Sequence, residues 1–461
     1  MSPLDRKDYL REIDDDFRRQ IDLYKDDTSE PKKVIIEFRN DKTLQLARQV
    51  RQVPINILKF RKNNGRISSD LISYESQHGE IDESTTEGQE ILRGFLEKKS
   101  KTENSTLKKS LQHHGQTEPA IITCDGFLIN GNRRKMIFDQ LHNSYPNETK
   151  FSFLRVVILP GPDDPGGAPT LQEIEQVENR LQLIKTGKAE YEGFDGALSV
   201  RRKLALGISI KEQLGDNPEH FGKTETQLKN AVKKEEKEKI HPLECIDRYL
   251  IFYNRKQAYD SVGERWQAFV DYSNFYSMYL QNEGKRLKHF GGKIDDSDVP
   301  KIEEIAFKMI RKQSFPNLLD RQKLHALMRD LKHLLKYDSS REEMYKIAEE
   351  IPDELTSEEK EELGDNPTVK QLDALWGSKT NQKFTEILNN SKKYFIQGKT
   401  KETPFDSIKA VISKLKRIKF AERMNLSDVK NHLTQFRNAQ DILDDLISEL
   451  DHLRQKAKKG D

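Results

Sequence analysis

The chain has 461 residues, 34% of them charged and 34% hydrophobic, and its 79 basic and 77 acidic residues give a net charge of +2. This length accommodates roughly two to four domains, and the balanced charge means that any nucleic-acid site must be a local basic patch. Two cysteines, Cys124 and Cys245, exclude a disulfide scaffold or a zinc-finger cluster. Because no long apolar run or signal-peptide core is present, we expect a cytoplasmic protein without a membrane span.

The first hundred residues predict short helices and strands in a polar setting. Residues 4–25 carry apolar side chains three or four positions apart, which indicates a helix. Short apolar runs predict strands at residues 33–38 and 53–58. The stretch 61–106 is rich in Ser, Thr and Glu, and we expect one helix in it, near residues 91–98, between loops.

A strand-turn-strand unit that leads directly into a helix is the most informative segment of the chain. An apolar strand at 120–122 reaches an Asp-Gly turn, and a second strand follows at 127–129. Gly131 then permits a tight bend into a helix that begins with Arg133 and Arg134. Backbone N–H groups at a helix start attract anions, and guanidiniums add charge and bidentate donors. The pattern is that of a phosphate site, and a hairpin followed by a helix with solvated arginines fits these residues equally well.

A strand expected at 151–159 precedes a helix with a clear start signal. Thr170 and Glu173 have the spacing of a capping box, and apolar residues follow at helical intervals. The same helix carries Glu178 and Asn179, whose oxygens suit a magnesium ion. Taken alone, these two residues fit a solvated helix surface better.

From about residue 190 onward the pattern is helical, and it opens with a helix-turn-helix signature. Ser209 caps a short helix that Gly215 ends, and Thr224 or Thr226 caps a second helix. The second helix carries side chains that suit base edges and phosphates around Leu228, Ala231 and Val232, which we expect to be buried. The predicted DNA-binding residues are Thr224, Thr226, Gln227, Lys229, Asn230 and Lys233. The Lys/Glu run 233–239 reads as a salt-bridged, solvated helix surface.

The remaining helices carry two further patterns. Closely spaced aromatic residues from Tyr249 to Tyr279 are more typical of a helical core than of a base-stacking surface. The final helix, expected from Leu426 to about Lys456, repeats apolar residues at heptad spacing, with Gln440 in one of these positions. This pattern fits a coiled coil, an antiparallel helix pair, or an amphipathic helix packed on its own domain.

Three of these segments, in this order, resemble the nucleotide motifs of the ParB family of partition proteins over roughly residues 50–240. Leu107–Pro119 is similar to the first motif, a helix and glycine loop before a proline. Gly131–Arg134 is similar to the second, usually Gly-Glu-Arg-Arg, and Glu178–Gln182 to the third, usually Glu-Asn-x-x-Arg. A helix-turn-helix follows the third motif in that family, as it does here.

The resemblance implies a cytidine triphosphate site that acts as a switch, in which nucleotide and DNA together close a dimer into a sliding clamp. The implied nucleotide contacts are Gly115, Gln116, Pro119, Gly131, Asn132, Arg133, Arg134, Glu178, Asn179 and Arg180. Glu178 and Asn179 would hold magnesium. Asn132 stands where the family has glutamate and Gln182 where it has arginine, so the choice of base and any hydrolysis of the nucleotide, as a CTPase, stay open.

The expected fold is α+β, with a small mixed-sheet ParB/sulfiredoxin-like domain followed by a largely all-α region. The expected division is an N-terminal helix and extension (1–50), the nucleotide domain (51–187), the helix-turn-helix domain (188–290) and a helical C-terminal region (291–461) that is a candidate for dimerisation. The expected function is nucleotide-switched DNA binding in plasmid partition, regulation or mobile-element defence, as a homodimer with a possible ATPase or defence partner. The alternatives are a free-serine kinase or a nuclease on this fold, with Glu118 or Asp125 near the phosphates, and a structural helical adaptor.

Overall fold

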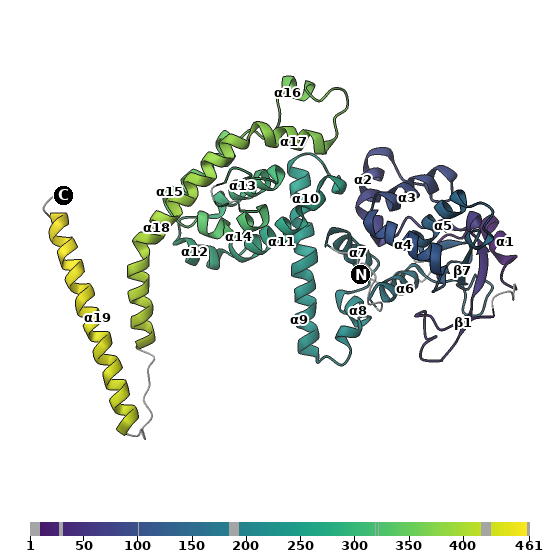
Figure 1. The fold of residues 1–461 in the computed structure, drawn as a ribbon, viewed down its shortest axis with the longest axis horizontal. Coiled ribbons are helices and arrows are strands. Elements are labelled where there is room, and N and C mark those ends of the chain that lie inside the picture. The colour runs from purple at the N-terminus through teal and green to yellow at the C-terminus, as the bar shows by residue number, and fades with distance from the viewer. Residues whose placement is uncertain are drawn as a thin grey trace. The chain divides into compact units, whose positions relative to one another are not determined.

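In this computed structural model, residues 10–26, 31–99, 101–183, 193–318, 320, 322–415 and 426–458 are described. The chain separates into two compact units, Met1–Phe395 and Ile396–Asp461. Helices make up most of the first unit and surround a small mixed sheet (Figure 1), which confirms the expected α+β class. Among the described helices, none combines the length and apolar character needed to cross a membrane.

The central sheet has five short strands in the order β3-β7-β5-β6-β4. The strands are β3 (Arg51–Pro54), β4 (Lys59–Phe60), β5 (Ala120–Ile122), β6 (Phe127–Asn130) and β7 (Phe153–Ile158). β5 and β6 form the expected hairpin, whereas β5 runs parallel to β7 and β4 runs parallel to β6. β3 closes one edge antiparallel to β7. A separate two-stranded pair joins β1 (Lys33–Val34) to β2 (Arg48–Gln49).

Side chains alternate along these strands and so divide between two cores. On one side of the sheet, strand residues pack with the helix α6 (Leu171–Leu183): Ile121, Ile129, Val157, Leu159, Ile174 and Val177. On the other side, strand residues pack with the helix α5 (Asn132–Ser144): Ile122, Leu128, Val156, Met136, Ile137, Phe138 and Leu141. The helices that carry the second and third motifs therefore lie against opposite sides of the sheet.

The prediction for residues 61–106 was wrong, because this stretch forms more helix than expected. It contains α2 (Ser68–His78), α3 (Thr86–Lys98) and the first turns of α4 (Lys101–His114). The side chains that α2 buries are Ser68, Ser69, Leu71 and Ser73. Three of these four are serines, and the Ser73 hydroxyl donates to the Ser69 carbonyl at 2.7 Å. A helix that packs through small polar side chains leaves no apolar period for sequence reasoning to detect.

Three predicted elements near the N-terminus are shorter than expected. Within 4–25, helix is described only in α1 (Asp15–Asp22), whose start Asp14 caps by accepting from the backbone of Asp16 and Phe17; residues 1–9 lie outside the described residues. The strand expected at 33–38 is reduced to β1. The strand expected at 53–58 ends at Pro54, after which Ile55–Ile57 forms a 3-10 turn.

The helical part of the first unit shares one apolar core, which runs from α7 to the first part of α18 and crosses the boundary expected at residue 290. Tyr249, Phe269, Tyr272 and Phe275 are buried in it, so the aromatic series is core as predicted. The helices are α7 (Gly193–Ala205), α8 (Ile210–Gly215), α9 (Glu225–Glu235), α10 (His241–Phe252), α11 (Trp266–Phe275), α12 (Glu283–Phe290), α13 (Val299–Lys312), α14 (Leu324–Leu334), α15 (Asp338–Glu350), α16 (Ser357–Glu361), α17 (Val369–Lys379) and α18 (Asn381–Leu415).

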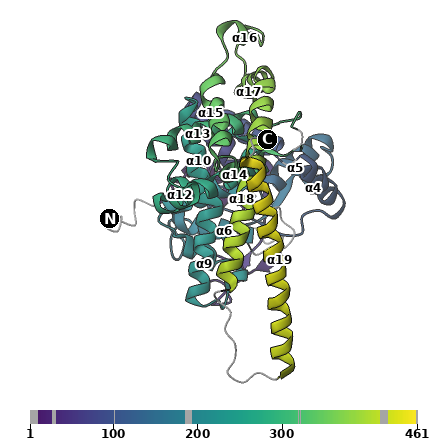
Figure 2. The same cartoon turned by 90° about the vertical axis from the view of Figure 1, so that its left-hand side faces the viewer.

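The second unit contains the end of α18 and the helix α19 (Leu426–Lys458). Figure 2 shows α19 as one uninterrupted helix. The predicted final helix is therefore confirmed.

Candidate functional site

The start of α5 has the geometry that the sequence predicted for a phosphate site. Gly131 precedes the helix with φ = +89°, in the left-handed region. A Cβ at this position would lie 2.8 Å from the Cβ of Ala120, so a side chain is excluded by both conformation and contact. No side chain caps the first turn. The backbone N–H groups of that turn are thus left for a ligand or solvent.

Asn132, the first residue of α5, has an unpaired acceptor. Its side chain is buried, with 6% of the residue exposed, and its Nδ2 donates to the carbonyl of Leu128 at 3.2 Å. Its Oδ1 is buried and has no hydrogen-bond partner in the structure. Because an unpaired buried acceptor costs about 1–3 kcal/mol, this oxygen favours the arrival of a hydrogen-bond donor.

The Arg133 guanidinium is held in place and lies close to another cation. Its Nε donates to Asn104 Oδ1 at 2.9 Å, and its Nη1 lies 3.2 Å from the Glu103 carboxylate. Burial and, second, the charge of Arg66 lower the pKa of Arg133. Arg66 follows β4 and was not predicted as a site residue. The positive charge of Arg66 thus opposes that of Arg133, and an anion bound beside the two side chains would be attracted by both.

Arg134 repeats this arrangement on the next position of the helix. Burial and, second, the charge of Arg155 lower the pKa of Arg134 to about 10. At neutral pH the side chain therefore stays protonated. It donates to the backbone carbonyl of Glu118, in the loop before β5. The start of α5 thus carries two arginines, and an arginine from another element helps to lower the pKa of each.

The first and second predicted motifs lie together. Gly115 follows α4 with φ = +66°. The Gln116 amide donates to the carbonyls of Glu118 and Arg155, each at 2.8 Å, and accepts from the Arg155 N–H at 2.7 Å. Gln116 and Arg134 share the Glu118 carbonyl as acceptor. With its side chain used in this way, Gln116 positions the loop, and Pro119 beside it is half-buried.

The third motif lies in a buried ion-pair network that was not predicted. Glu178 is 2% exposed; its carboxylate pairs with Arg61 and accepts from the Gly65 N–H at 3.1 Å. Arg61 also reaches Glu175 at 3.1 Å, and Arg202 reaches Glu175 at 2.8 Å and Glu178 at 3.6 Å. Burial alone would raise the pKa of Glu175, but Arg202 and Arg61 hold it below its usual value. Two carboxylates and two guanidiniums thus compensate each other.

Asn179 and Arg180 connect this network to the helix-turn-helix. Asn179 Oδ1 accepts from Lys203 Nζ at 2.7 Å, and Asn179 Nδ2 lies 3.1 Å from the Gln213 carbonyl and 3.2 Å from Asp216 Oδ2. Arg180 Nε donates to Asp216 Oδ1 at 2.9 Å. Burial lowers the pKa of Lys203 to about 8. Gln213 belongs to α8 and Asp216 caps its end, so the third motif contacts the first helix of the predicted DNA-binding unit.

These contacts bear on the predicted magnesium site. Within the described part of the chain, no group of three or more His, Cys, Asp or Glu side chains is placed to hold a metal. Instead, the Glu178 carboxylate pairs with Arg61, and Asn179 Oδ1 accepts a hydrogen bond from Lys203. Metal binding by these two residues stays a prediction, and it requires the oxygens to exchange partners.

A short segment after β4 links the two halves of the predicted site. Gly65 donates its N–H to Glu178, and its neighbour Arg66 is the cation that lowers the pKa of Arg133. This segment therefore contacts the network on α6, and its charge acts on the start of α5, although the two helices pack on opposite sides of the sheet.

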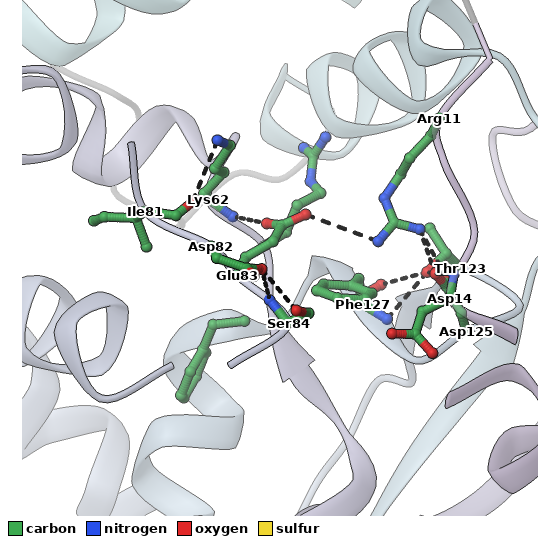
Figure 3. Close-up of polar contacts among 12 residues, drawn as sticks. Arg11, Asp14, Lys62, Ile81, Asp82, Glu83, Ser84, Thr123, Asp125 and Phe127 are labelled. Atoms are coloured by element: carbon green, nitrogen blue, oxygen red, sulfur yellow. Dashed lines mark hydrogen bonds and ion pairs between the residues drawn. The ribbon is translucent and has the colours of Figure 1, made fainter. Parts of the chain in front are cut away.

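The two carboxylates considered for an enzyme on this fold lie in different surroundings. Asp125 lies at the turn of the β5–β6 hairpin, the opposite end from Gly131, and it is fully buried. One Arg11 guanidinium nitrogen lies 2.8 and 2.6 Å from its two oxygens, and Thr123 donates to it at 2.6 Å (Figure 3). Burial and, second, Asp125 raise the pKa of Cys124 to about 11, so its thiol is protonated at neutral pH. Glu118 is exposed beside Arg134.

The predicted helix-turn-helix has the expected capping. Ser209 and Glu212 form a capping box at the start of α8, and Thr224 and Gln227 form another at the start of α9. Four of the six predicted DNA contacts are exposed and free of this capping role: Thr226, Lys229, Asn230 and Lys233. Thr224 and Gln227 are exposed but bind each other. The expected burial of Leu228, Ala231 and Val232 was overstated, because all three are only half-buried.

α9 does not end where a compact helix-turn-helix would end. It continues through the π-helical segment Glu236–Ile240 into α10 without a loop (Figure 1). Within the Lys/Glu run, Lys239 pairs with Glu235, and Lys234 lies 4.0 Å from Glu238. The interpretation of this run as a salt-bridged helix surface is confirmed.

The arginines and lysine that surround the predicted motifs had no signal in the sequence. Arg61 and Arg66 lie in the polar stretch that was expected to be mostly loop, and Arg61 is separated from Glu175 by 114 positions. Arg155 lies on a strand, and Lys203 lies on α7.

In comparisons with known proteins, the chain matches no family model, no curated protein and no solved structure. The similarity to ParB proteins therefore rests on the three motifs and the helix-turn-helix pattern.

Proposed function

We propose that this protein binds a nucleoside triphosphate at the start of α5 and DNA through α9, and that the first site controls the second. The observation that carries the proposal is the start of α5, where Gly131 leaves the first-turn amides without a side-chain cap and where Arg133 and Arg134 bring two guanidinium charges. The charges of Arg66 and Arg155 act on these two side chains and lower their pKa values. A triphosphate has the charge and the oxygens that such a site lacks. Cytidine triphosphate with magnesium is the expected form.

The contacts on α6 give a physical route between the two sites. An anion between Arg133 and Arg66 would draw Arg66 toward it and shift the adjoining Gly65, which donates to Glu178. Glu178 is followed on α6 by Asn179, whose amide contacts Gln213 and Asp216 at the end of α8. A movement at the nucleotide is thereby passed to the unit that carries α9.

The nucleotide proposal is tested with labelled CTP, ATP and GTP, each with and without magnesium and DNA. Arg133→Ala and Arg66→Ala should each weaken binding at least tenfold, because each removes one of two facing guanidiniums. Arg19→Ala is the control, since this arginine is exposed and pairs only with Asp16 in the same helix. Absence of binding by all three nucleotides at millimolar concentration would refute the nucleotide site.

DNA binding is tested by its salt dependence. Replacing Lys229 and Lys233 together with alanine should weaken binding and lower the slope of log K against log salt by about 2, since each phosphate contact contributes about 0.9. Replacing Lys379 and Lys383 with alanine changes the net charge equally but alters surface ion pairs with Glu362 and Glu350. If both double variants have the same slope, α9 does not contact the phosphates.

The wider role that we propose is plasmid partition, gene regulation or mobile-element defence in the cytoplasm, with an ATPase or defence protein as a further partner. The alternative enzymatic functions would each form a different product. Release of phosphoserine from serine and ATP, or cleavage of DNA, would replace the switch by a catalytic function, whereas release of inorganic phosphate from CTP alone would add hydrolysis to the switch.

A further inference from the structure

α19 carries an apolar stripe whose described side chains are exposed. Its apolar residues recur alternately three and four positions apart, as at the a and d positions of a heptad. The described members of this stripe, which we call the α19 seam, are Val429, Leu433, Phe436, Leu443, Ile447 and Leu450. Leu433 is 51% exposed, Ile447 56% and Leu450 54%, values typical of surface side chains. Gln440 occupies the one polar position of the seam.

The charges beside the seam divide the helix into two halves of opposite sign. In this heptad register, Lys430 and Arg437 occupy the e positions of the first half, and Asp444 and Asp451 occupy those of the second half. Lys430 and Asp451 are separated by 21 positions, or about 32 Å along the axis, so the two cannot pair within one helix. Asp451 makes only a 3.9 Å contact with exposed Arg454.

We propose that α19 pairs with α19 of a second copy of this chain in antiparallel orientation. Antiparallel coiled coils place a residues opposite d residues and e residues opposite e residues. When Phe436 faces the partner's Ile447, Lys430 meets the partner's Asp451 and Arg437 meets the partner's Asp444. One register therefore satisfies the apolar seam and both kinds of charged pair, and twofold symmetry repeats each pair.

The other side of the seam supports the same orientation. The antiparallel register brings Ala439 opposite the partner's Leu446, an apolar contact that also covers the 43% exposed Leu446. A parallel pair would place g residues opposite e residues instead. His432 would then face the partner's Arg437, and Leu446 would face the partner's Asp451, so no flanking pair would be attractive. Near the centre, Gln440 faces the partner's Leu443, a polar position of the kind that limits slippage of the register.

This inference does not depend on nucleotide or DNA binding, and charge reversal in the full-length chain tests it. Lys430→Glu with Arg437→Glu makes all four e positions acidic, and Asp444→Lys with Asp451→Lys makes all four basic. Each double variant should dissociate at least tenfold more readily than the parent chain in sedimentation equilibrium. An equimolar mixture of the two should associate as tightly as the parent, because opposite charges then face each other. All four positions are exposed, and circular dichroism checks that the helices are retained.

A disulfide test fixes the orientation. Chains with Arg437→Cys are mixed with chains carrying Asp444→Cys under mild oxidation. The antiparallel register should give mainly cross-links between the two kinds of chain, and the native Cys124 and Cys245 are buried. A parent chain that is monomeric at tens of micromolar, charge-reversed chains that associate like the parent, a mixture that fails to associate, or cross-links mainly between identical chains would each overturn the proposal.

Discussion

Two charged regions flank the central sheet, and their arginines have different charged neighbours. At the start of α5, Arg133 and Arg134 each lie close enough to another arginine for its charge to lower their pKa. On the opposite side of the sheet, Arg61 and Arg202 lie between Glu175 and Glu178 in a buried network. In the first region arginine charges oppose one another, and the named counter-charge is the half-exposed Glu103, 3.2 Å from Arg133. In the second region every named charge has a buried opposite partner.

This difference predicts which substitutions affect ligand binding and which affect the stability of the fold. A network whose charges compensate each other gains nothing from a further ion, and its value lies in holding α6, α7 and the segment after β4 together. Charges of the same sign oppose each other, and an anion that binds beside them is attracted by both. We therefore expect substitutions in the network to affect folding first, and substitutions at the start of α5 to affect ligand binding first.

The sharpest test of this contrast is to remove one cation from each region. Arg61→Ala should lower the free energy of unfolding by about 3–5 kcal/mol, because it leaves Glu175 and Glu178 buried with a single guanidinium. Arg133→Ala should change it by less than about 1 kcal/mol, because its carboxylate partner Glu103 is half-exposed. Chemical unfolding followed by circular dichroism measures both. Equal losses would show that the two regions are alike.

A second comparison concerns the bend itself. Gly131→Ala should cost roughly 2–4 kcal/mol, since it adds the strain of a positive φ, about 1–2 kcal/mol, to a close contact with Ala120. Gly115→Ala provides the matched control: its φ is +66°, but a Cβ there would meet nothing within 4 Å. It should cost only the conformational part. Thermal unfolding of the two variants separates contact from conformation, and similar midpoints would remove the argument that Ala120 excludes a side chain.

The smallest expected effect is the pH dependence of the network. Burial lowers the pKa of Lys203 to about 8 in the folded chain from its usual 10.5. Between these values the unfolded state holds the extra proton, so stability rises with pH through this group, by at most about 1.4 kcal/mol per pH unit. Lys203→Gln should lose that contribution while keeping a donor for Asn179 Oδ1. Chemical unfolding of the parent and the variant, in buffers that contain EDTA at pH 7 to 9.5, measures the difference. Identical pH profiles would place the Lys203 pKa near its usual value.

The parts of the fold that sequence reasoning predicted are those with local signals. The β5–β6 hairpin, the bend at Gly131, the Thr170–Glu173 capping box and the capped start of α9 all follow from residues within a few positions of each other. α19 was predicted because its heptad pattern extends over about 30 residues.

The elements that were missed depend on distant contacts. α2 packs through serines, one of which, Ser73, donates to the carbonyl of Gln257 in the helical region. The candidate site stays a prediction, made from glycine, arginine and acidic residues at recognisable spacings. Whether Glu178 faces a solvent ion or Arg61 is decided by the fold, since these residues lie 117 positions apart.

The unbroken passage from α9 into α10 has a mechanical consequence. A helix that ends in a loop can rotate independently of its neighbours. Here α9 continues into α10, and Tyr249 of α10 packs among aromatic rings. The packing of these aromatic residues consequently determines the direction of α9, and with it the orientation of Lys229 and Lys233. A cavity created around Tyr249 would therefore change the direction of the continuous α9–α10 helix.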